Sequence, residues 1–377
     1  MDIERSYLIH HAVGKGSFGT VYRATQQGAG GFSKVVAIKI LNPEMEGWED
    51  VAARLRDEAK ILGLFRHRAV LHVDGLYQID GRWSVVMEYV PGSALYRVLR
   101  ARETLPLGAA LEMVSELASA LHVAYASQGP EGPLKIIHRD IKPSNIQLST
   151  AGEVKLLDWG VARAEFEARE SETKSMLMGS RGYMAPERLQ SIDTPAGDIY
   201  ALGVVLGESL SGQRFGKTFF TEAKHEQHIE ACLQTVAREV GPDFEAVKPL
   251  LERMLAYDHQ ARITAKEIER EIRNLRGVVP APWLAEWAET TLVSLVEQQK
   301  VEMGDAELNG STLHERTEPM ATDEIPRAPA HTAESTLTPA RSIGAIATLA
   351  VIGGLALIGF LVVVAALLFV GNGLMAP

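Results

Sequence analysis

The stretch Ile137–Asn145, which reads IHRDIKPSN, brings three chemically distinct side chains onto one short segment. Asp140 carries a carboxylate that can accept a proton from a hydroxyl group, and Lys142 carries a positive charge. Asn145 offers an amide oxygen, which suits a divalent cation. Transfer of a phosphoryl group to a hydroxyl needs such a carboxylate near the nucleophile and cation ligands near the phosphates. A charged surface loop is the alternative interpretation of this segment taken alone.

A second acidic motif follows at a distance that favours the metal-binding interpretation. The tripeptide DWG begins at Asp158, thirteen residues after Asn145. We expect Asp158 to be a second metal ligand. The sequence MAPE, which ends at Glu187, closes a segment of about 30 residues that begins at Asp158. These spacings argue against a plain surface loop at IHRDIKPSN.

A glycine-rich segment, GKGSFGTV, occupies residues 14–21. Glycines let backbone N–H groups approach phosphate oxygens closely, although a plain turn would use the same residues. A dinucleotide-binding fold would place a helix directly after the glycines, whereas TVYRAT is rich in β-forming residues. We therefore expect the glycines at the tip of a β-hairpin.

Lys39 lies in the apolar run VVAIKIL, which predicts a buried strand. A lysine in such a strand often extends its ammonium group to solvent, so this motif is weak by itself. Glu58 lies on a predicted helix over 48–65 and could supply the anion that fixes Lys39 at a phosphate. Residues 7–90 are otherwise strand-rich, and the pattern is helical from about Ser93 onward.

In this order and spacing, GKGSFG, VAIK, a helix glutamate, HRDIKPSN, DWG and APE resemble the signature motifs of the eukaryotic-like protein kinases. The resemblance covers residues 9–275, about 70% of the chain. It implies an α+β fold with two lobes, a β-rich N-lobe over about 7–90 and a helical C-lobe over about 91–276. ATP and Mg²⁺, or Mn²⁺ in its place, would bind between the lobes.

The resemblance also implies a role for each motif residue. Asp140 accepts the proton of the substrate hydroxyl, and Lys142 stabilises the transferred phosphoryl group. Asn145 and Asp158 hold magnesium. The residues expected around ATP are Val13, Gly14, Lys15, Gly16, Ser17, Phe18, Gly19, Val21, Ala37, Lys39, Glu58, Met87, Glu88 and Val90.

Within the expected ATP site, Lys39 pairs with Glu58 and Met87 closes the rear of the adenine pocket. The backbones of Glu88 and Val90 form hydrogen bonds with the base. The sequence KPSN after HRD is typical of the serine/threonine class, so the implied partners are protein substrates with Ser or Thr. The rival interpretation, a pseudokinase scaffold, is disfavoured because the motif residues are intact.

Three further residues have structural roles by the same resemblance. Glu187 and Arg262 form a buried ion pair, and Asp198 braces the catalytic loop. Trp159 stands where these kinases usually have Phe. A bulkier side chain costs about 1–3 kcal/mol unless its neighbours are smaller. We expect Trp159 to affect packing and the balance of conformations, and to bind no metal.

The segment between DWG and APE contains several hydroxyl groups. We expect autophosphorylation there, foremost at Thr173, because a phosphate could pair with Arg139 and Arg163. Unmodified hydroxyls in a mobile loop are the alternative. The candidate residues of this activation segment are Ser171, Thr173, Ser175 and Ser180.

Composition limits the partners and the compartment. The chain has 377 residues and a formal net charge of -10, which argues against nucleic acid as a partner because phosphate backbones need a basic surface. A single cysteine, Cys232, excludes an intramolecular disulfide framework and fits a reducing compartment.

The C-terminal part predicts a membrane anchor. Residues 343–370 contain no charged side chain and exceed the ~20 residues that cross a bilayer. Before them we expect a helix over 280–300 and a flexible Thr/Pro/Glu-rich linker over 303–341, and after them a short tail over 371–377. We therefore expect a single-pass protein of the cell membrane with a cytoplasmic kinase domain. Small residues at Ala350 and Gly354 could let two spans pack as a homodimer.

Overall fold

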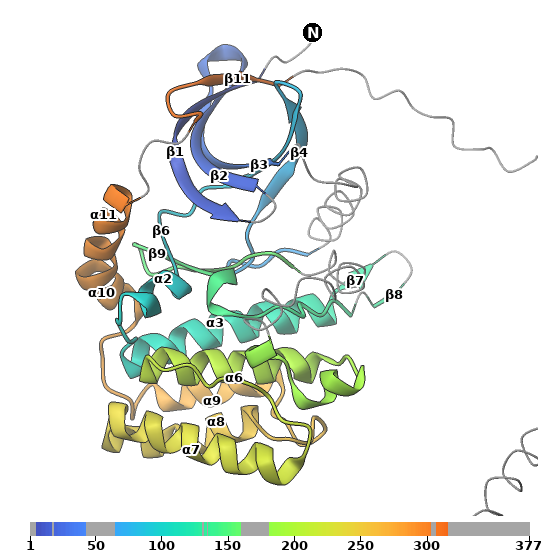
Figure 1. Ribbon diagram of the computed structural model, residues 1–377, viewed down its shortest axis with the longest axis vertical. Helices are drawn as coiled ribbons and strands as arrows, with labels where there is room; N and C mark the ends of the chain where they lie inside the picture. The colour runs from blue at the N-terminus through green and yellow to red at the C-terminus, as the bar shows by residue number, and fades with distance from the viewer. Residues whose placement is uncertain are drawn as a thin grey trace, which may run out of the picture. The chain divides into compact units, whose positions relative to one another are not determined.

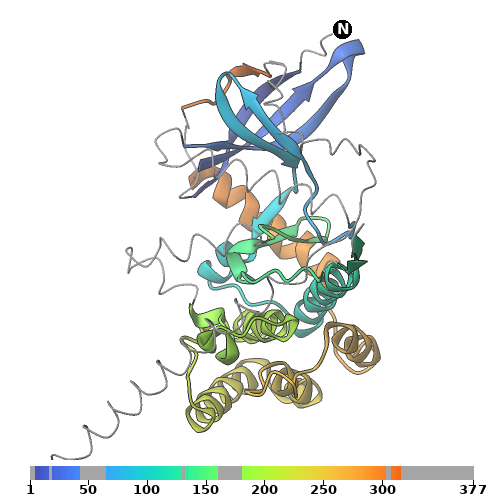
Figure 2. The ribbon, with the colours of Figure 1, turned by 90° about the vertical axis from the view of Figure 1, so that its right-hand side faces the viewer.

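The computed structural model describes residues 5–16, 19–42, 65–129, 132–133, 135–159, 181–302 and 307–315. All of them belong to one unit, residues 1–318. Residues 319–377 lie outside the described residues. The described unit has a β-sheet lobe and a helical lobe (Figures 1 and 2). The two-lobed α+β fold predicted from the sequence is confirmed.

A six-stranded antiparallel sheet forms the N-lobe, in the order β11-β1-β2-β3-β5-β4. Its strands are β1 (Ser6–Gly16), β2 (Gly19–Gln27), β3 (Ser33–Leu41), β4 (Val73–Ile79), β5 (Arg82–Glu88) and β11 (Thr312–His314). Successive side chains of a strand face opposite sides, so Val36, Ile38 and Ile40 of β3 all point into the core of this lobe. The opposite face of β3 therefore carries Ala37 and Lys39.

Strand β11 comes from a segment that the sequence predicts to be a linker. The prediction of a flexible linker over 303–341 is wrong at residues 312–314. These residues form β11, which pairs antiparallel with residues 6–8 of β1. On its other side, His314 O accepts a hydrogen bond from Asp80 N at 3.0 Å, just beyond the end of β4. Leu313 is buried in the N-lobe core. The sheet thus closes on itself, with β11 between the outer edges of β1 and β4 (Figure 1).

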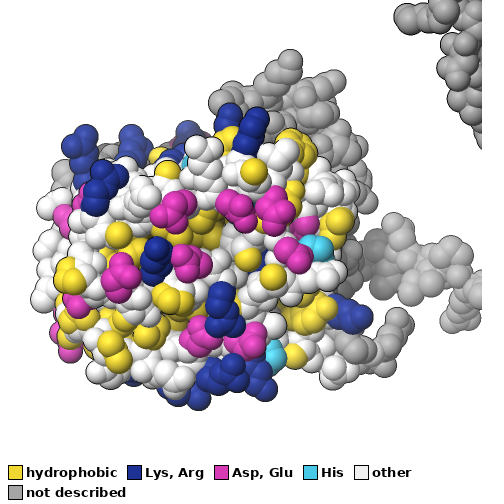
Figure 3. All heavy atoms as spheres, turned by 90° about the horizontal axis from the view of Figure 1, so that it is seen from below, with side chains coloured by type: hydrophobic (Ala, Val, Ile, Leu, Met, Phe, Trp, Pro, Cys, Tyr) yellow, Lys and Arg dark blue, Asp and Glu magenta, His cyan; other side chains and the backbone are white. Residues whose placement is uncertain are grey.

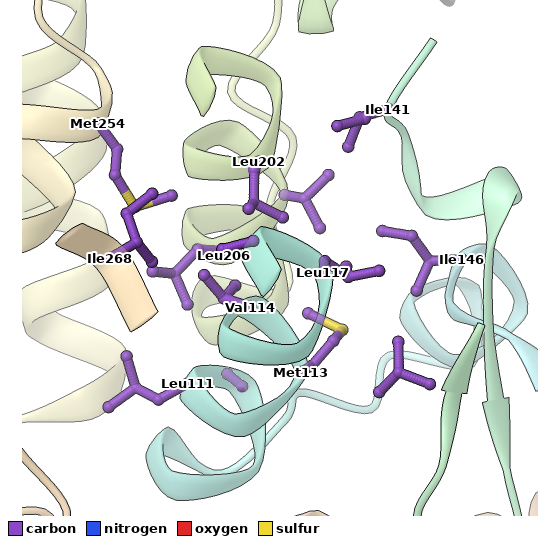
Figure 4. Close-up of a cluster of buried hydrophobic side chains, with 14 of the residues drawn as sticks. Leu111, Met113, Val114, Leu117, Ile141, Ile146, Leu202, Leu206, Met254 and Ile268 are labelled. Atoms are coloured by element: carbon purple, nitrogen blue, oxygen red, sulfur yellow. The ribbon is translucent and has the colours of Figure 1, made fainter. Parts of the chain in front are cut away.

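Helices make up most of the C-lobe. They are α2 (Leu95–Arg100), α3 (Leu107–Ala126), α6 (Pro195–Ser211), α7 (Glu222–Val240), α8 (Lys248–Met254) and α9 (Ala265–Leu275). Local signals set their ends, because Thr264 and Glu267 form a capping box at the start of α9 and α6 ends at Gly212 with φ 66°. In the core, Val114 of α3 lies beside Leu206 of α6 (Figure 4).

Helix α3 is the one helix of the described residues that is long and apolar enough to cross a membrane, judged by length and composition alone. However, 67% of its apolar window is buried inside the C-lobe. It is therefore the central helix of a packed lobe. The membrane span predicted over 343–370 lies outside the described residues.

Two small sheets complete the C-lobe. Strands β6 (Gly92–Ala94), β9 (Ile146–Ser149) and β10 (Val154–Leu156) form a sheet in the order β10-β9-β6. Strands β9 and β10 carry the chain from Asn145 to Leu157, so they join the two segments with the predicted metal ligands. The hairpin of β7 (Gln128–Gly129) and β8 (Gly132–Pro133) follows α3.

The fold continues beyond the boundary predicted at residue 276. Helix α10 (Leu284–Trp287), the π-helical turn η7 (Ala288–Leu292) and α11 (Val293–Glu302) follow, in agreement with the helix predicted over 280–300. Trp287 and Leu292 are buried in the C-lobe core. A Cβ atom on Gly152 would lie 2.5 Å from Ala285 Cα, and one on Gly108 would lie 2.9 Å from Pro282 O. We call residues 277–315 the C-terminal extension. It packs closely on the C-lobe and then supplies β11 to the N-lobe (Figure 2).

Acidic and basic side chains are interspersed over the face seen from below the C-lobe (Figure 3). Ion pairs along the C-lobe helices include Arg273 with Glu269 and Lys248 with Glu252. Nucleic acids are bound by continuous basic surfaces. This face presents no such surface among its described residues.

Candidate active site

The loop that precedes β9 brings the three predicted reactive side chains together. Asp140 Oδ2 lies 2.9 Å from Lys142 Nζ and accepts a hydrogen bond from Asn145 Nδ2 at 3.1 Å. Asn145 Nδ2 also donates to the backbone O of Asp140 at 2.9 Å. The amide nitrogen of Asn145 is thus directed at Asp140, which leaves Oδ1 as the atom that can bind a cation. A 3₁₀ turn, η2 (Pro143–Asn145), sets these positions, with Asn145 N donating to Lys142 O.

Asp198, near the start of α6, holds this loop from the C-lobe core. Its Oδ2 atom accepts a hydrogen bond from His138 N at 2.7 Å, and its Oδ1 atom accepts one from Arg139 N at 2.9 Å. Arg139 has φ 69°, a left-handed conformation that costs a residue other than glycine about 1–3 kcal/mol. The buried carboxylate of Asp198 therefore stabilises a strained backbone immediately before Asp140, which is the bracing role predicted for it.

His138 connects the loop to the segment of Asp158. Its Nε2 atom lies 3.0 Å from Leu157 O, and its Nδ1 atom lies 3.3 Å from Asp140 N. A carbonyl oxygen only accepts, so Nε2 carries the proton and the neutral ring satisfies both partners. Burial lowers the pKa of His138, although the carboxylate of Asp198 opposes this effect. The ring is therefore neutral at pH 7.

Asp158 follows β10 and lies close to the catalytic loop through a backbone contact, because Leu157 N donates to Asn145 O at 2.8 Å. A carboxylate and an amide oxygen are ligands that Mg²⁺ accepts, and this ion usually completes its shell with phosphate oxygens and water. The described residues contain no group of three His, Cys, Asp or Glu side chains placed to hold a metal. By its donor atoms, the pair of Asn145 and Asp158 could hold a magnesium ion that also binds nucleotide phosphates.

Trp159 packs into the C-lobe core beside this site. Its ring meets those of Phe65 and His138 edge to face, with centroids 5.1 Å and 5.0 Å away, and 1% of the residue is exposed. Its Nε1 atom is buried without a hydrogen-bond partner among the described residues. The indole is a packing group, as the sequence suggests.

The predicted adenine-site side chains share one face of the N-lobe sheet. Directly opposed residues of antiparallel strands point to the same side. The ladders place Val21 opposite Lys39 and Ala37 opposite Met87. The ladder also places Val85 opposite Lys39. These positions lie on the face opposite the N-lobe core.

The glycine-rich segment forms the predicted β-hairpin. Lys15 is opposite Thr20 and Gly16 is opposite Gly19, at the ends of β1 and β2. The ladder shifts between Ala12 and Gly14, so that Val13 is left out of register. The backbone O of Val13 accepts a hydrogen bond from Arg97 Nη2 at 3.2 Å, which links β1 to α2 of the C-lobe.

The connection between the lobes is fixed by side chains of the C-lobe sheet. The Glu88 carboxylate binds Lys155 Nζ at 2.9 Å, and Glu88 N donates to His72 O. A backbone hydrogen bond from Glu88 to a base would therefore use its carbonyl. Val90 is buried, and its carbonyl accepts from Gln147 Nε2 at 3.4 Å.

The predicted buried ion pair is present. Arg262 binds Glu187 through two bonds, Nη1 to Oε1 at 2.6 Å and Nη2 to Oε2 at 2.8 Å. The remaining guanidinium N–H groups also have acceptors, among them Ala256 O at 2.7 Å and Tyr257 O at 3.0 Å. A buried charge needs this degree of pairing.

Seven of the predicted site residues lie outside the described residues, so their roles stay predictions. They are Ser17, Phe18, Glu58, Ser171, Thr173, Ser175 and Ser180.

The sequence did not single out two residues that contact the catalytic loop. Arg188 directly follows Glu187 and binds Asp198, with Nη2 2.9 Å from Oδ1. Asp193 lies 2.5 Å from Arg139 Nε. Both lie in a 3₁₀ segment, η5 (Pro186–Gln190), and the turn after it, where no periodic pattern marks a residue as special. Their closeness to APE was the one available signal.

The comparisons with known proteins agree with this geometry. A family model described as the protein kinase domain matches residues 7–271. The chain belongs to the protein kinase family. The matched residues include the glycine-rich hairpin, Lys39, the catalytic loop and Arg262.

Individual relatives of this kinase differ in their stated specificity. It is 32% identical to the tyrosine-protein kinase MasK of Myxococcus xanthus, over 69% of this chain and 41% of the relative. It is 34% identical to the serine/threonine-protein kinase PknA of Mycobacterium tuberculosis, over 55% of this chain and 47% of the relative. The alignments thus span less than half of these relatives. The kinase domain of PknI from Mycobacterium tuberculosis has the same fold, with a TM-score of 0.51 and 22% identity over 71% of this chain and 94% of that one.

Proposed function

We propose that this kinase transfers the γ-phosphoryl group of ATP to serine and threonine hydroxyls of proteins. The observation that carries the proposal is the catalytic loop, in which Asp140 Oδ2 contacts both Lys142 Nζ and Asn145 Nδ2. The sequence KPSN and the relatives named as serine/threonine kinases support the choice of hydroxyl. Because one relative is named as a tyrosine kinase, the experiment must distinguish phosphorylation of serine and threonine from phosphorylation of tyrosine.

In the proposed reaction, the substrate oxygen bonds to the γ-phosphorus while the bond from phosphorus to the ADP oxygen breaks. Asp140 orients the hydroxyl and accepts its proton. Lys142 is close enough to Asp140 to neutralise charge that develops on the transferred group. Lys39 would bind the α- and β-phosphates from the N-lobe. Magnesium, held by Asn145 and Asp158, would screen the phosphate charges.

The test incubates the full chain in detergent with Mg²⁺ and labelled ATP, and identifies the phosphorylated amino acids after acid hydrolysis. We expect phosphoserine and phosphothreonine, and no label with Asp140→Asn. Phosphotyrosine alone would contradict the proposed specificity. Nucleotide binding without any label would support the alternative, a pseudokinase scaffold.

We further propose that residues 343–370 tether the kinase to the cell membrane with its catalytic domain in the cytoplasm. The 28 uncharged residues of this segment support a single span. The tether predicts that the chain sediments with membranes and is released when residues 343–370 are deleted. A second copy could pack through Ala350 and Gly354, and cross-linking in the membrane would detect such a homodimer.

Autophosphorylation in the activation segment completes the proposal. Its expected site is Thr173, with Ser171, Ser175 and Ser180 as the other candidates. Mass spectrometry of the active protein and of Asp140→Asn would locate the phosphates. Phosphate on the segment of the inactive variant would contradict autophosphorylation within the same molecule or its dimer.

A further inference from the structure

Four charged side chains of alternating sign, Asp198, Arg188, Asp193 and Arg139, form a row of ion pairs next to the catalytic loop. Arg188 donates through Nη2 to Asp198 Oδ1 at 2.9 Å and through Nε to Asp193 Oδ1 at 3.2 Å. Asp193 Oδ2 in turn lies 2.5 Å from Arg139 Nε. A Cβ atom on Gly197 would lie 2.7 Å from Arg188 Nε, so the glycine makes room for the guanidinium. The row of ion pairs is therefore part of the close packing of this region.

This row of ion pairs holds Arg139 by its backbone as well as by its side chain. Arg139 N donates to Asp198 Oδ1, and Arg139 O accepts from Arg188 Nη1 at 3.2 Å. These contacts fix both peptide units of a residue whose φ of 69° is unfavourable for arginine. Asp140 is the next residue. Its position therefore depends on Arg188 and Asp193 as well as on Asp198.

Asp198 and Asp193 differ in solvent exposure, and we expect them to have different roles. The Asp198 side chain is 3% exposed and accepts three hydrogen bonds, so it belongs to the core. The Asp193 side chain is 34% exposed and contacts only guanidinium groups in the described contacts. An exposed ion pair adds little to stability. The effect of Asp193 is therefore expected in the placement of Arg139 and not in the stability of the lobe.

We propose that Arg188 and Asp193 are positioning residues of the phosphoryl-transfer reaction, with Asp193 as a built-in anionic partner of Arg139. The proposal rests on the proposed kinase function. The resemblance to protein kinases implies that Arg139 awaits a phosphate on the activation segment. Here a carboxylate of the fold already contacts Nε of that guanidinium, so we expect Asp193 to hold the loop with Asp140 in place before the activation segment carries a phosphate.

The test compares Asp193→Asn and Asp193→Glu in the full chain, with Glu269→Gln as the matched control. Glu269 is a carboxylate of similar exposure, 32%, in the ion pair with Arg273. We expect Asp193→Asn to lower kcat roughly tenfold or more while KM for ATP stays within about twofold. Asp193→Glu keeps the charge and should recover most of kcat. Arg188 reaches its three acceptors from three different nitrogens. Arg188→Lys has all its donors on one nitrogen and cannot span these acceptors, so it should lower kcat in the same way.

The phosphate-independence is tested with wild-type protein that has been treated with phosphatase, which should show its full initial rate. A lag that ends as phosphate is incorporated would overturn the proposal. So would a kcat for Asp193→Asn equal to that of Glu269→Gln, or a loss that Asp193→Glu does not reduce.

A second measurement separates this proposal from the proposed function. Hydrogen exchange over residues 136–142 should accelerate in Asp193→Asn and stay unchanged in Glu269→Gln. If the wild type transfers no phosphate, the kinase function fails and the exchange result alone decides the positioning role. Unchanged exchange in Asp193→Asn would then overturn it.

Discussion

Replacing Leu313 by Ala tests whether the C-terminal extension is part of the N-lobe fold. Leu313 is 8% exposed and lies in the same core as Tyr7. Large-to-small core substitutions of this type cost about 2–5 kcal/mol, and a site on a three-residue strand should fall near ~2 kcal/mol because it can relax. Neighbouring contacts, such as the 2.8 Å hydrogen bond from Tyr7 to Glu315, the residue after β11, stay intact.

Thermal and urea unfolding of the full chain measure this effect. For a unit that spans residues 1–318, a loss of ~2 kcal/mol corresponds to a Tm about 3 °C lower. Thr312→Ala and His314→Ala are the controls, because both residues are exposed on the same strand and should change stability by less than ~0.5 kcal/mol. A Leu313→Ala variant as stable as these controls would refute the packing of β11.

Three other outcomes follow from the site. Trp159→Phe removes ~40 Å³ of side chain, a cavity cost of ~1 kcal/mol. It also removes a buried N–H that has no partner among the described residues, which should gain ~1–3 kcal/mol. Its stability should therefore lie between that of the wild type and ~2 kcal/mol above it by urea unfolding, and a large change in the Mg²⁺ dependence of activity would contradict its packing role. Glu187→Gln leaves the charge of Arg262 buried and unpaired and should cost ~3–5 kcal/mol in thermal unfolding, whereas a loss below ~1 kcal/mol would contradict the burial of the pair. Burial lowers the pKa of His138, so below about pH 6.5 the unfolded chain binds a proton that the folded chain does not. The contribution of the neutral ring to stability is therefore fully present above about pH 6.5 and is lost as the pH is lowered. Urea unfolding between pH 5 and 8 should show a smaller pH slope for His138→Gln, and an equal slope would contradict the neutral ring.

The catalytic loop could be predicted because its chemistry is local. Asp140, Lys142 and Asn145 lie within one short segment, and a 3₁₀ turn brings their side chains together. The face that carries Lys39 could also be predicted, because strand periodicity assigns it without tertiary information. The two-lobed fold followed from the order of these motifs.

The remaining contacts depend on residues far apart in the sequence. Strand β11 has one apolar residue, Leu313, in a Thr-rich segment, and it is a strand only because β1 offers an unpaired edge and a core position. Asp193 and Arg139 are 54 positions apart, and a surface charge in a turn carries no sign of its partner. Tertiary structure was needed for both.

The close contacts of the C-terminal extension are made at two glycines inside the catalytic domain. Gly108 is the second residue of α3, and glycine has no advantage over alanine in a helix, so helix formation does not explain it. The backbone of Pro282 occupies the space that a side chain at this position would need, and Ala285 does the same at Gly152. A relative with larger residues at both positions could not seat an extension along the same path. Gly108 is the more informative of the two sites, because the φ of 79° at Gly152 favours glycine with or without the extension. Gly108 therefore allows inheritance of the extension to be traced among related kinases, even where the sequence after the domain has diverged beyond alignment.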